Sequence, residues 1–146
     1  MKEIWTGIQI GLAAIGGFIG YFVGGLDKLL YALIIFVAVD YATGILRAIV
    51  ENKLSSRIGA RGIVKKVTIF LIVGVGNIAD IYLLGNGSAL RTAVICFYAA
   101  NEGLSLLENT VAIGLPVPDK LKQALAQLHS KSENKQSDMD GNGDEE

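Results

Sequence analysis

Long apolar runs constrain this chain of 146 residues more than any other feature. Four runs occur, at about residues 4–23, 29–50, 67–84 and 92–113, and short polar segments separate them. A helix needs about 20 predominantly apolar residues to cross a bilayer, and each run reaches or approaches that length. In lipid, a lone spanning segment must pair its backbone groups internally, which only a helix does. The sequence therefore predicts an all-α integral membrane protein with about four transmembrane helices.

The first run, residues 4–23, has two interpretations. A secretory signal peptide would use Lys2 as its basic start, but its apolar part would be too long and no cleavage site precedes a polar segment. We therefore expect a retained span. Its small residues recur every four positions, a spacing that lets membrane helices pack closely, although glycine is also common in such helices generally. The predicted packing face consists of Gly16, Gly20 and Gly24.

The second run, residues 29–50, carries Asp40 at its centre. A carboxylate there costs about 3 kcal/mol, which the surrounding apolar residues still outweigh. The polar residues of this run share one helical stripe with Asp40. The stripe ends near the end of the run, where the side chain of Arg47 can reach the lipid headgroups. Its members are Asp40, Thr43, Gly44, Arg47 and Glu51.

A basic segment, Glu51–Lys66, connects the second and third runs and holds five basic residues and one acid. A nucleic-acid-binding patch is the alternative, but a position between two spans favours a role in membrane topology, and no nucleic-acid partner is expected. Short basic loops stay in the cytoplasm, so four spans would place both termini there. The predicted orienting residues of this loop are Lys53, Arg57, Arg61, Lys65 and Lys66.

The third run, residues 67–84, contains glycines spaced like a dinucleotide-binding fingerprint. We reject that interpretation, because the fingerprint needs flanking strands and an acid about 20 residues downstream. Within this run Asn77 and Asp80 are expected to share one helix face, since they are three residues apart.

The fourth run, residues 92–113, is the most polar, with one polar and one apolar face. We favour a span whose polar face meets protein or water; a helix on the membrane surface, leaving three spans, is the alternative. Counted from the ends of their runs, Asp40 and Glu102 both lie near the midplane, where an ionisable group is a functional candidate by default. The polar face, which would line a pore or contact other helices, comprises Tyr98, Asn101, Glu102, Ser105, Glu108 and Asn109.

The polar end of the chain follows two prolines, Pro116 and Pro118, that cannot continue a helix. A short amphipathic helix is expected at about 118–128. Residues 129–146 lack the apolar surface to pack a core and are predicted to form a disordered acidic tail.

No catalytic constellation is recognisable in the sequence, and we expect neither an enzyme nor a cofactor. The single cysteine, Cys96, lies in an apolar run, and the single histidine, His129, has no neighbouring ligand for a metal. The intramembrane ionisable groups are therefore the main functional candidates.

Four groups of residues occur in an order and spacing that is specific as a combination: Asp40-Tyr41-x-Thr43-Gly44; Leu54-Ser55-Ser56-x-x-Gly59-x-x-Gly62-x-x-Lys65-Lys66; Asp80 with Asn101-Glu102-Gly103-Leu104-Ser105-x-x-Glu108-Asn109; and Gly114-Leu115-Pro116-x-Pro118-x-x-Leu121. This combination resembles the phage-lysis and toxin-secretion holin family. The resemblance implies a homo-oligomer in the bacterial cytoplasmic membrane that opens lesions. Through them an endolysin or a large toxin would pass, without binding the holin stably.

Two other functions remain as alternatives. A small proton-coupled exporter would also have four short spans and a membrane-embedded carboxylate, but it would need stacking aromatics, and Trp5 lies at the interface instead. A membrane-anchored protein acting through its acidic tail is the third possibility.

The orientation of the chain provides the first test. We expect residue 140 and the Glu51–Lys66 segment to be inaccessible from outside intact cells. Single cysteines introduced at these positions on a Cys96→Ser background would be probed with a membrane-impermeant thiol reagent. Labelling of position 140 from outside would contradict four spans.

Overall fold

The computed structural model describes residues 1–85, 87–121 and 123 and consists of four helices in that part of the chain. They are α1 (Lys2–Phe22), α2 (Lys28–Val50), α3 (Ser56–Tyr82) and α4 (Ala89–Ile113). The helices α1, α2 and α3 are each long and apolar enough to cross a membrane. The chain is thus an all-helical membrane protein, as predicted, with three such helices in the described part.

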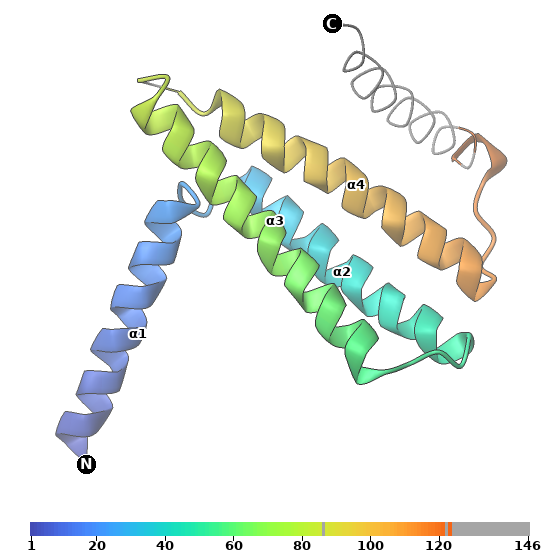
Figure 1. The fold of residues 1–146 in the computed structure, drawn as a ribbon, viewed down its shortest axis with the longest axis horizontal. Helices are drawn as coiled ribbons and strands as arrows, with labels where there is room; N and C mark the ends of the chain where they lie inside the picture. Colours follow the sequence, from blue (N-terminus) through green and yellow to red (C-terminus); the bar gives the residue numbers. More distant parts are fainter. Residues whose placement is uncertain (86, 122, 124–146) are drawn as a thin grey trace, which may run out of the picture.

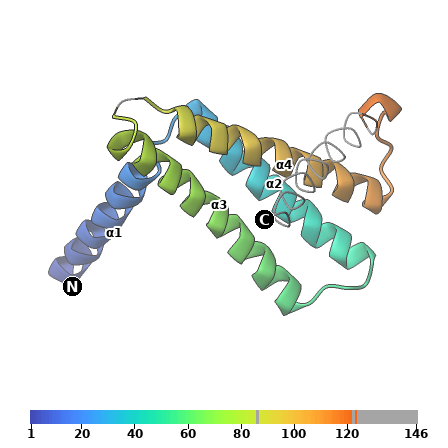
Figure 2. The ribbon, with the colours of Figure 1, turned by 45° about the horizontal axis from the view of Figure 1, so that its top comes forward.

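Helices α2, α3 and α4 pack side by side, and α1 diverges from them (Figures 1 and 2). Helices α2 and α4 run in the same direction, with α3 antiparallel to both. The core between these three helices is built from branched aliphatic side chains at most 7% exposed. Its central members are Leu30, Leu33 and Val37 of α2, Ile69 and Val73 of α3, and Ile95 of α4.

The third helix begins at Ser56, eleven residues before the predicted start at Val67. Ser55 caps it, because its hydroxyl accepts a hydrogen bond from the backbone N–H of Ile58 at 3.3 Å. The expectation of a basic loop over Glu51–Lys66 is therefore wrong for most of that segment. Charged residues are compatible with a helix. They interrupt the apolar run from which the span was predicted, so the predicted start at Val67 is later than the start of the helix itself.

The fourth helix, α4, ends at Ile113, as the following glycine and prolines indicate. Gly114 adopts a φ of 95°, which closes the helix in the left-handed region. The predicted amphipathic helix at 118–128 lies largely outside the described residues, and the predicted tail at 129–146 lies wholly outside them.

Helix α1 contacts the rest of the chain mainly near its C-terminal end. The Phe22 ring lies where a side chain on Gly74 of α3 would be, and Asn77 donates hydrogen bonds to the carbonyls of Tyr21 and Phe22 at 3.2 and 3.1 Å. The Tyr21 and Tyr82 hydroxyls are 3.4 Å apart. No residue of α1 is buried, so its remaining surface is free for contacts outside the protomer.

The glycines of the predicted packing face do not all lie on α1. At Gly16 and Gly20, a Cβ atom would meet no atom of another segment within 4 Å, so their face is open. Gly24 lies beyond the helix with a φ of 81°, and a side chain there would overlap Asn77. Gly24 is therefore a turn residue of the protomer itself and cannot extend an outer packing face.

The packing of Phe22 of α1 against Gly74 of α3 can be tested by substitution. Gly74→Leu should displace Phe22, at a cost of about 1–3 kcal/mol for overpacking. Tyr21→Cys and Tyr82→Cys on a Cys96→Ser background should be joined by a flexible bifunctional thiol reagent that replaces the reach of the two tyrosine side chains, and Gly74→Leu should abolish most of this cross-link. Val75→Leu, at an exposed neighbouring position, is the matched control. Equal cross-linking in both variants would contradict this packing.

Candidate functional site

A buried ion-pair network joins the three packed helices near their middle. The ammonium of Lys66 on α3 donates to Asp40 of α2 at 2.5 Å and also to Glu102 of α4. The side chains of Lys66, Asp40 and Glu102 are only 18%, 7% and 9% exposed. With both carboxylates ionised, one lysine faces two acids, so the formal charges sum to −1.

Asn109 and Thr43 complete the network on the side of α2 and α4. The Asn109 amide donates to the Asp40 carboxylate at 3.2 Å and to the Thr43 hydroxyl at 3.3 Å. The Thr43 hydroxyl in turn donates to the backbone carbonyl of Asp40 at 2.9 Å. In the described part of the chain, no buried side-chain nitrogen or oxygen lacks a hydrogen-bond partner. The buried polar residues are thus satisfied within one protomer, and they need neither neighbouring subunits nor water.

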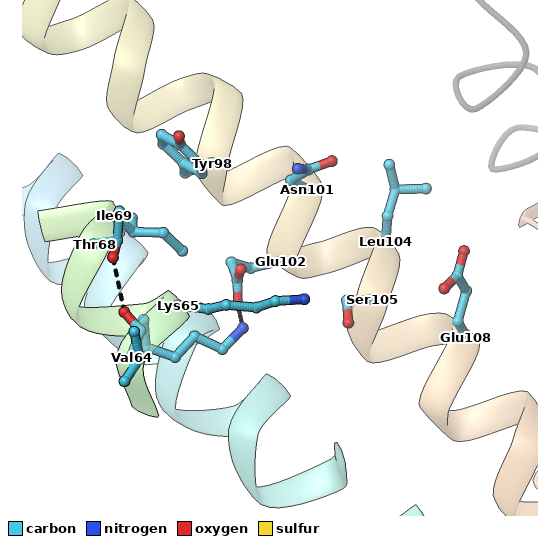
Figure 3. Close-up of a pocket in the computed structure, with 11 residues that line it drawn as sticks. Val64, Lys65, Thr68, Ile69, Tyr98, Asn101, Glu102, Leu104, Ser105 and Glu108 are labelled. Carbon is cyan, nitrogen blue, oxygen red and sulfur yellow. Dashed lines mark hydrogen bonds and ion pairs between the residues drawn. The ribbon is translucent and has the colours of Figure 1, made fainter. Parts of the chain in front are cut away.

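A groove beside this network lies between α3 and α4 and has a volume of about 500 Å³ (Figure 3). The side chain of Lys65 extends from α3 toward Ser105 (Figure 3), while the ammonium of Lys66 donates to Glu102. Asn101 and Glu108 are exposed at the groove. The other lining residues are Val64, Thr68, Ile69, Tyr98 and Leu104. The predicted polar face of α4 therefore divides by burial: Glu102, which also lines the groove, and Asn109 are buried, Ser105 is half-buried, and Asn101 and Glu108 are exposed.

A second polar cluster ties together the opposite ends of the helices around Arg91, which is 3% exposed. Its guanidinium donates to the carbonyls of Val23 and Gly25 at 2.6 and 3.0 Å and to the Asp27 carboxylate at 2.6 Å. The hydrogen bond from Arg91 holds the pKa of Asp27 below its ordinary value. Asp27 also caps α2 by accepting from the N–H of Leu30 at 2.8 Å. One arginine thus fixes the turn between α1 and α2 to the start of α4.

Asp80 and Asn77 share a buried face of α3, as predicted, and each satisfies backbone groups of another segment. Asp80 accepts hydrogen bonds from the N–H groups of Leu90 and Arg91 at 3.0 and 2.8 Å. It thereby caps the N-terminus of α4, where a negative charge is favourable, while Ser88 makes no side-chain cap. Asn77 instead donates to the carbonyls of Tyr21 and Phe22 at the C-terminal end of α1, so both residues connect α3 to the end of another helix.

Arg47 and most of the basic residues lie apart from the network. Arg47 pairs with Glu51 at 2.8 Å, and Lys53 pairs with the same carboxylate at 3.1 Å. Arg57 and Arg61 are exposed on the first turns of α3. Among the five basic residues predicted to set topology, only Lys66 enters the buried network.

Two residues of these clusters have roles that the sequence pattern does not predict. Hydropathy places Lys66 in a loop, although two midplane acids without a counter-ion indicate that a cation must reach them. It likewise places Arg91 in an external turn. The spacing of eleven residues between Asp80 and Arg91 does not reveal their contact, because the intervening turn brings the two together.

The described residues contain no group of three or more His, Cys, Asp or Glu side chains that could hold a metal ion. What the network can do is electrostatic: it buries one cation between two anions at the junction of three helices. The groove adds exposed polar side chains, among them Asn101 and Glu108, on the outer side of the same junction.

The chain is similar to several bacterial and phage proteins. An uncharacterised 14.9 kDa protein in the nagH 3′ region of Clostridium perfringens is 41% identical over 132 residues, which is 90% of this chain and 99% of that protein. An uncharacterised protein of Listeria innocua is 38% identical over 137 residues, or 91% and 97% of the two chains. A probable holin of Bacillus phage phi105 is 35% identical over 108 residues, or 74% and 79%. No solved structure matches the chain.

Residues 17–130 match the bacteriophage holin family, a region that includes α2, α3, α4 and the last turns of α1. This range contains both polar clusters and the groove. The match supports a holin-type role for a membrane protein and suggests a non-enzymatic one. The chain belongs to the bacteriophage holin family.

Proposed function

We propose that this protein oligomerises in the bacterial cytoplasmic membrane and forms pores or lesions that release an endolysin or a large toxin. The observation that carries the proposal is the polar groove between α3 and α4, whose exposed residues include Asn101 and Glu108. Family membership supports the holin-type role itself. The partners in this proposal are lipid, further copies of the chain, and a cargo that passes without stable binding.

The groove matters for function only if α4 lies within the membrane, and its packing supports that placement. Helix α4 runs beside α2, which is long and apolar enough to span. Contacts between the two helices extend from Asp27 and Arg91 near their starts to Thr43 and Asn109. A helix attached along a spanning helix occupies the same depth. We therefore retain four spans, with both termini in the cytoplasm.

Exposed polar side chains at that depth need a partner other than lipid. Asn101, Ser105 and Glu108 lie on one side of α4, and their groove is open to the surroundings of the protomer. Neighbouring protomers placed around a water-filled lumen would hydrate these side chains. One protomer has too few spans to enclose such a lumen, so oligomerisation follows from the same argument.

The exposed surface of α1 offers a second contact between protomers. Gly16 and Gly20 leave a shallow face on which a helix of another copy fits closely. Two different contact surfaces allow an assembly to grow beyond a dimer.

The buried network has a different role in this proposal: it holds the protomer together while the groove residues meet the lumen. Lys66 alone compensates Asp40 and Glu102, so each of the three helices contributes one charge. A three-way ion pair of this kind fixes the relative rotation of α2, α3 and α4.

The lumen assignment can be tested with leucine substitutions on α4. The double variant Asn101→Leu/Glu108→Leu should insert and fold, since both positions are exposed, but should lose most release of a cytoplasmic reporter enzyme, because an apolar lining excludes water. Ala93→Leu/Ala100→Leu adds the same residue at other exposed positions and should behave like the parent. A membrane-potential dye and reporter release would be followed together after induction.

An abrupt, delayed collapse of the potential with reporter release is expected for the parent protein. A steady potential at high expression would contradict pore formation. Saturable transport of one compound class without leakage would instead favour a proton-coupled exporter.

The structural role of the network predicts a strong asymmetry between variants. Lys66→Met leaves two buried carboxylates without a counter-ion and should destabilise the protomer by about 3–5 kcal/mol. The neutral triple variant Lys66→Met/Asp40→Asn/Glu102→Gln should recover most of that loss. Unfolding in mixed detergent micelles, followed by circular dichroism, measures both. Equal destabilisation of the single and triple variants would show that charge compensation is not what Lys66 provides.

A further inference from the structure

Helix α3 is longer than the hydrocarbon core of a membrane. Its 27 residues rise about 1.5 Å each, giving about 40 Å, whereas the core is about 30 Å thick. The aromatic Tyr82 marks the end of α3 next to the turn, a position typical of the membrane interface. About 20 residues counted back from Tyr82 reach Ile63. The first seven residues of α3, 56–62, therefore extend into the headgroup layer.

The start of α3 presents a row of cations, of which Arg57 and Arg61 lie in the extending part, whereas Lys65 lies one turn further along, from where its long side chain reaches back to the headgroups. Arg57, Arg61 and Lys65 follow one another at intervals of four, so they lie along one side of the helix. All three side chains are exposed, and none forms an ion pair with another described residue. We call these three residues the cationic row.

In the described part of the chain, no nearby acid forms an ion pair with the row. Glu51 pairs with Arg47 and Lys53, and Glu102 pairs with Lys66. Glu108 lines the same groove as Lys65 but makes no ion pair with it. This end of α3 thus keeps an uncompensated positive charge at the level of the headgroups.

Apolar side chains flank the cationic row. Ile58, Ile63 and Val64 are 46%, 53% and 65% exposed. In water such exposure is unfavourable, but at a membrane surface these side chains insert among the upper acyl carbons while the cations reach the phosphates. Exposed cations with apolar neighbours at this depth are complementary to an anionic lipid and not to a water-soluble anion alone.

We propose that Arg57, Arg61 and Lys65 bind the phosphodiester groups of anionic phospholipid headgroups, such as phosphatidylglycerol. Arginine suits this role because its planar guanidinium donates two parallel hydrogen bonds to one phosphate. The binding anchors the start of α3 and holds its register in the membrane. It requires only an inserted protomer, so it goes beyond pore formation. Because Lys65 also lines the groove between α3 and α4, its contact with lipid belongs to the protomer before that groove faces a lumen.

The test uses the full chain reconstituted in equimolar phosphatidylglycerol and phosphatidylcholine. After gentle delipidation in a neutral detergent, the retained lipids are quantified by mass spectrometry. The parent should retain phosphatidylglycerol preferentially, and each cation removed should weaken its binding by about fivefold. The variant Arg57→Gln/Arg61→Gln/Lys65→Gln should retain the two lipids nearly equally. In about 1 M salt the parent's preference should also fall, because charges at the surface are then screened.

A matched control removes the same charge elsewhere through Lys2→Gln/Lys28→Gln/Lys120→Gln, all at exposed positions. It should keep the parent's preference. Equal retention of phosphatidylglycerol by the parent and the row variant would overturn the proposal. A preference that appears only after residues 130–146 are removed would also overturn it, because the row would then bind the acidic tail of the chain itself.

Discussion

Burying charge inside a membrane protein is costly. In this chain the ion pairs of Lys66 with Asp40 and Glu102 offset that cost. Each of Asp40, Lys66 and Glu102 comes from a different helix, and none has another charged partner in the described structure. A carboxylate removed from water is tolerated only with a close counter-charge and further hydrogen bonding; here Asn109 donates to the Asp40 carboxylate, and Thr43 accepts from the same amide. The packing of α2, α3 and α4 therefore depends on this junction, because any rotation of one helix would separate a buried charge from its partner.

The Arg91 cluster solves a related problem at the other end of the bundle. Turns leave backbone carbonyls and helix N-termini without partners, and near a membrane these groups need them. Arg91 supplies donors to the turn after α1, while Asp80 caps α4. The two clusters have different structural roles. The Lys66 network fixes the rotation of α2, α3 and α4 relative to one another, and the Arg91 cluster fixes where the ends of the helices meet. Helix α1, which contributes only its last residues, remains available for contacts between protomers.

This division separates residues that maintain the protomer from residues that face outward. Polar residues of α4 that look equivalent along one face belong to both groups: Glu102 and Asn109 are buried in contact with Lys66 and Asp40, whereas Asn101 and Glu108 are exposed in the groove. A proposed lumen thus involves fewer side chains than the whole polar face. The same separation applies to α3, where Lys66 turns inward and its neighbour Lys65 remains exposed.

The sequence by itself determined the fold class, the four helices and the residues that are unusual at membrane depth, because apolar run length and the cost of an intramembrane charge are local properties. The family motifs likewise were recognisable from order and spacing. Tertiary structure alone decided which charges meet. Hydropathy predicts Lys66 in a loop, since the apolar run begins at Val67, but the cap at Ser55 starts the helix earlier and aligns Lys66 with Asp40 and Glu102. Contacts between residues 26 and 36 positions apart depend on helix packing, which no local pattern in the chain encodes.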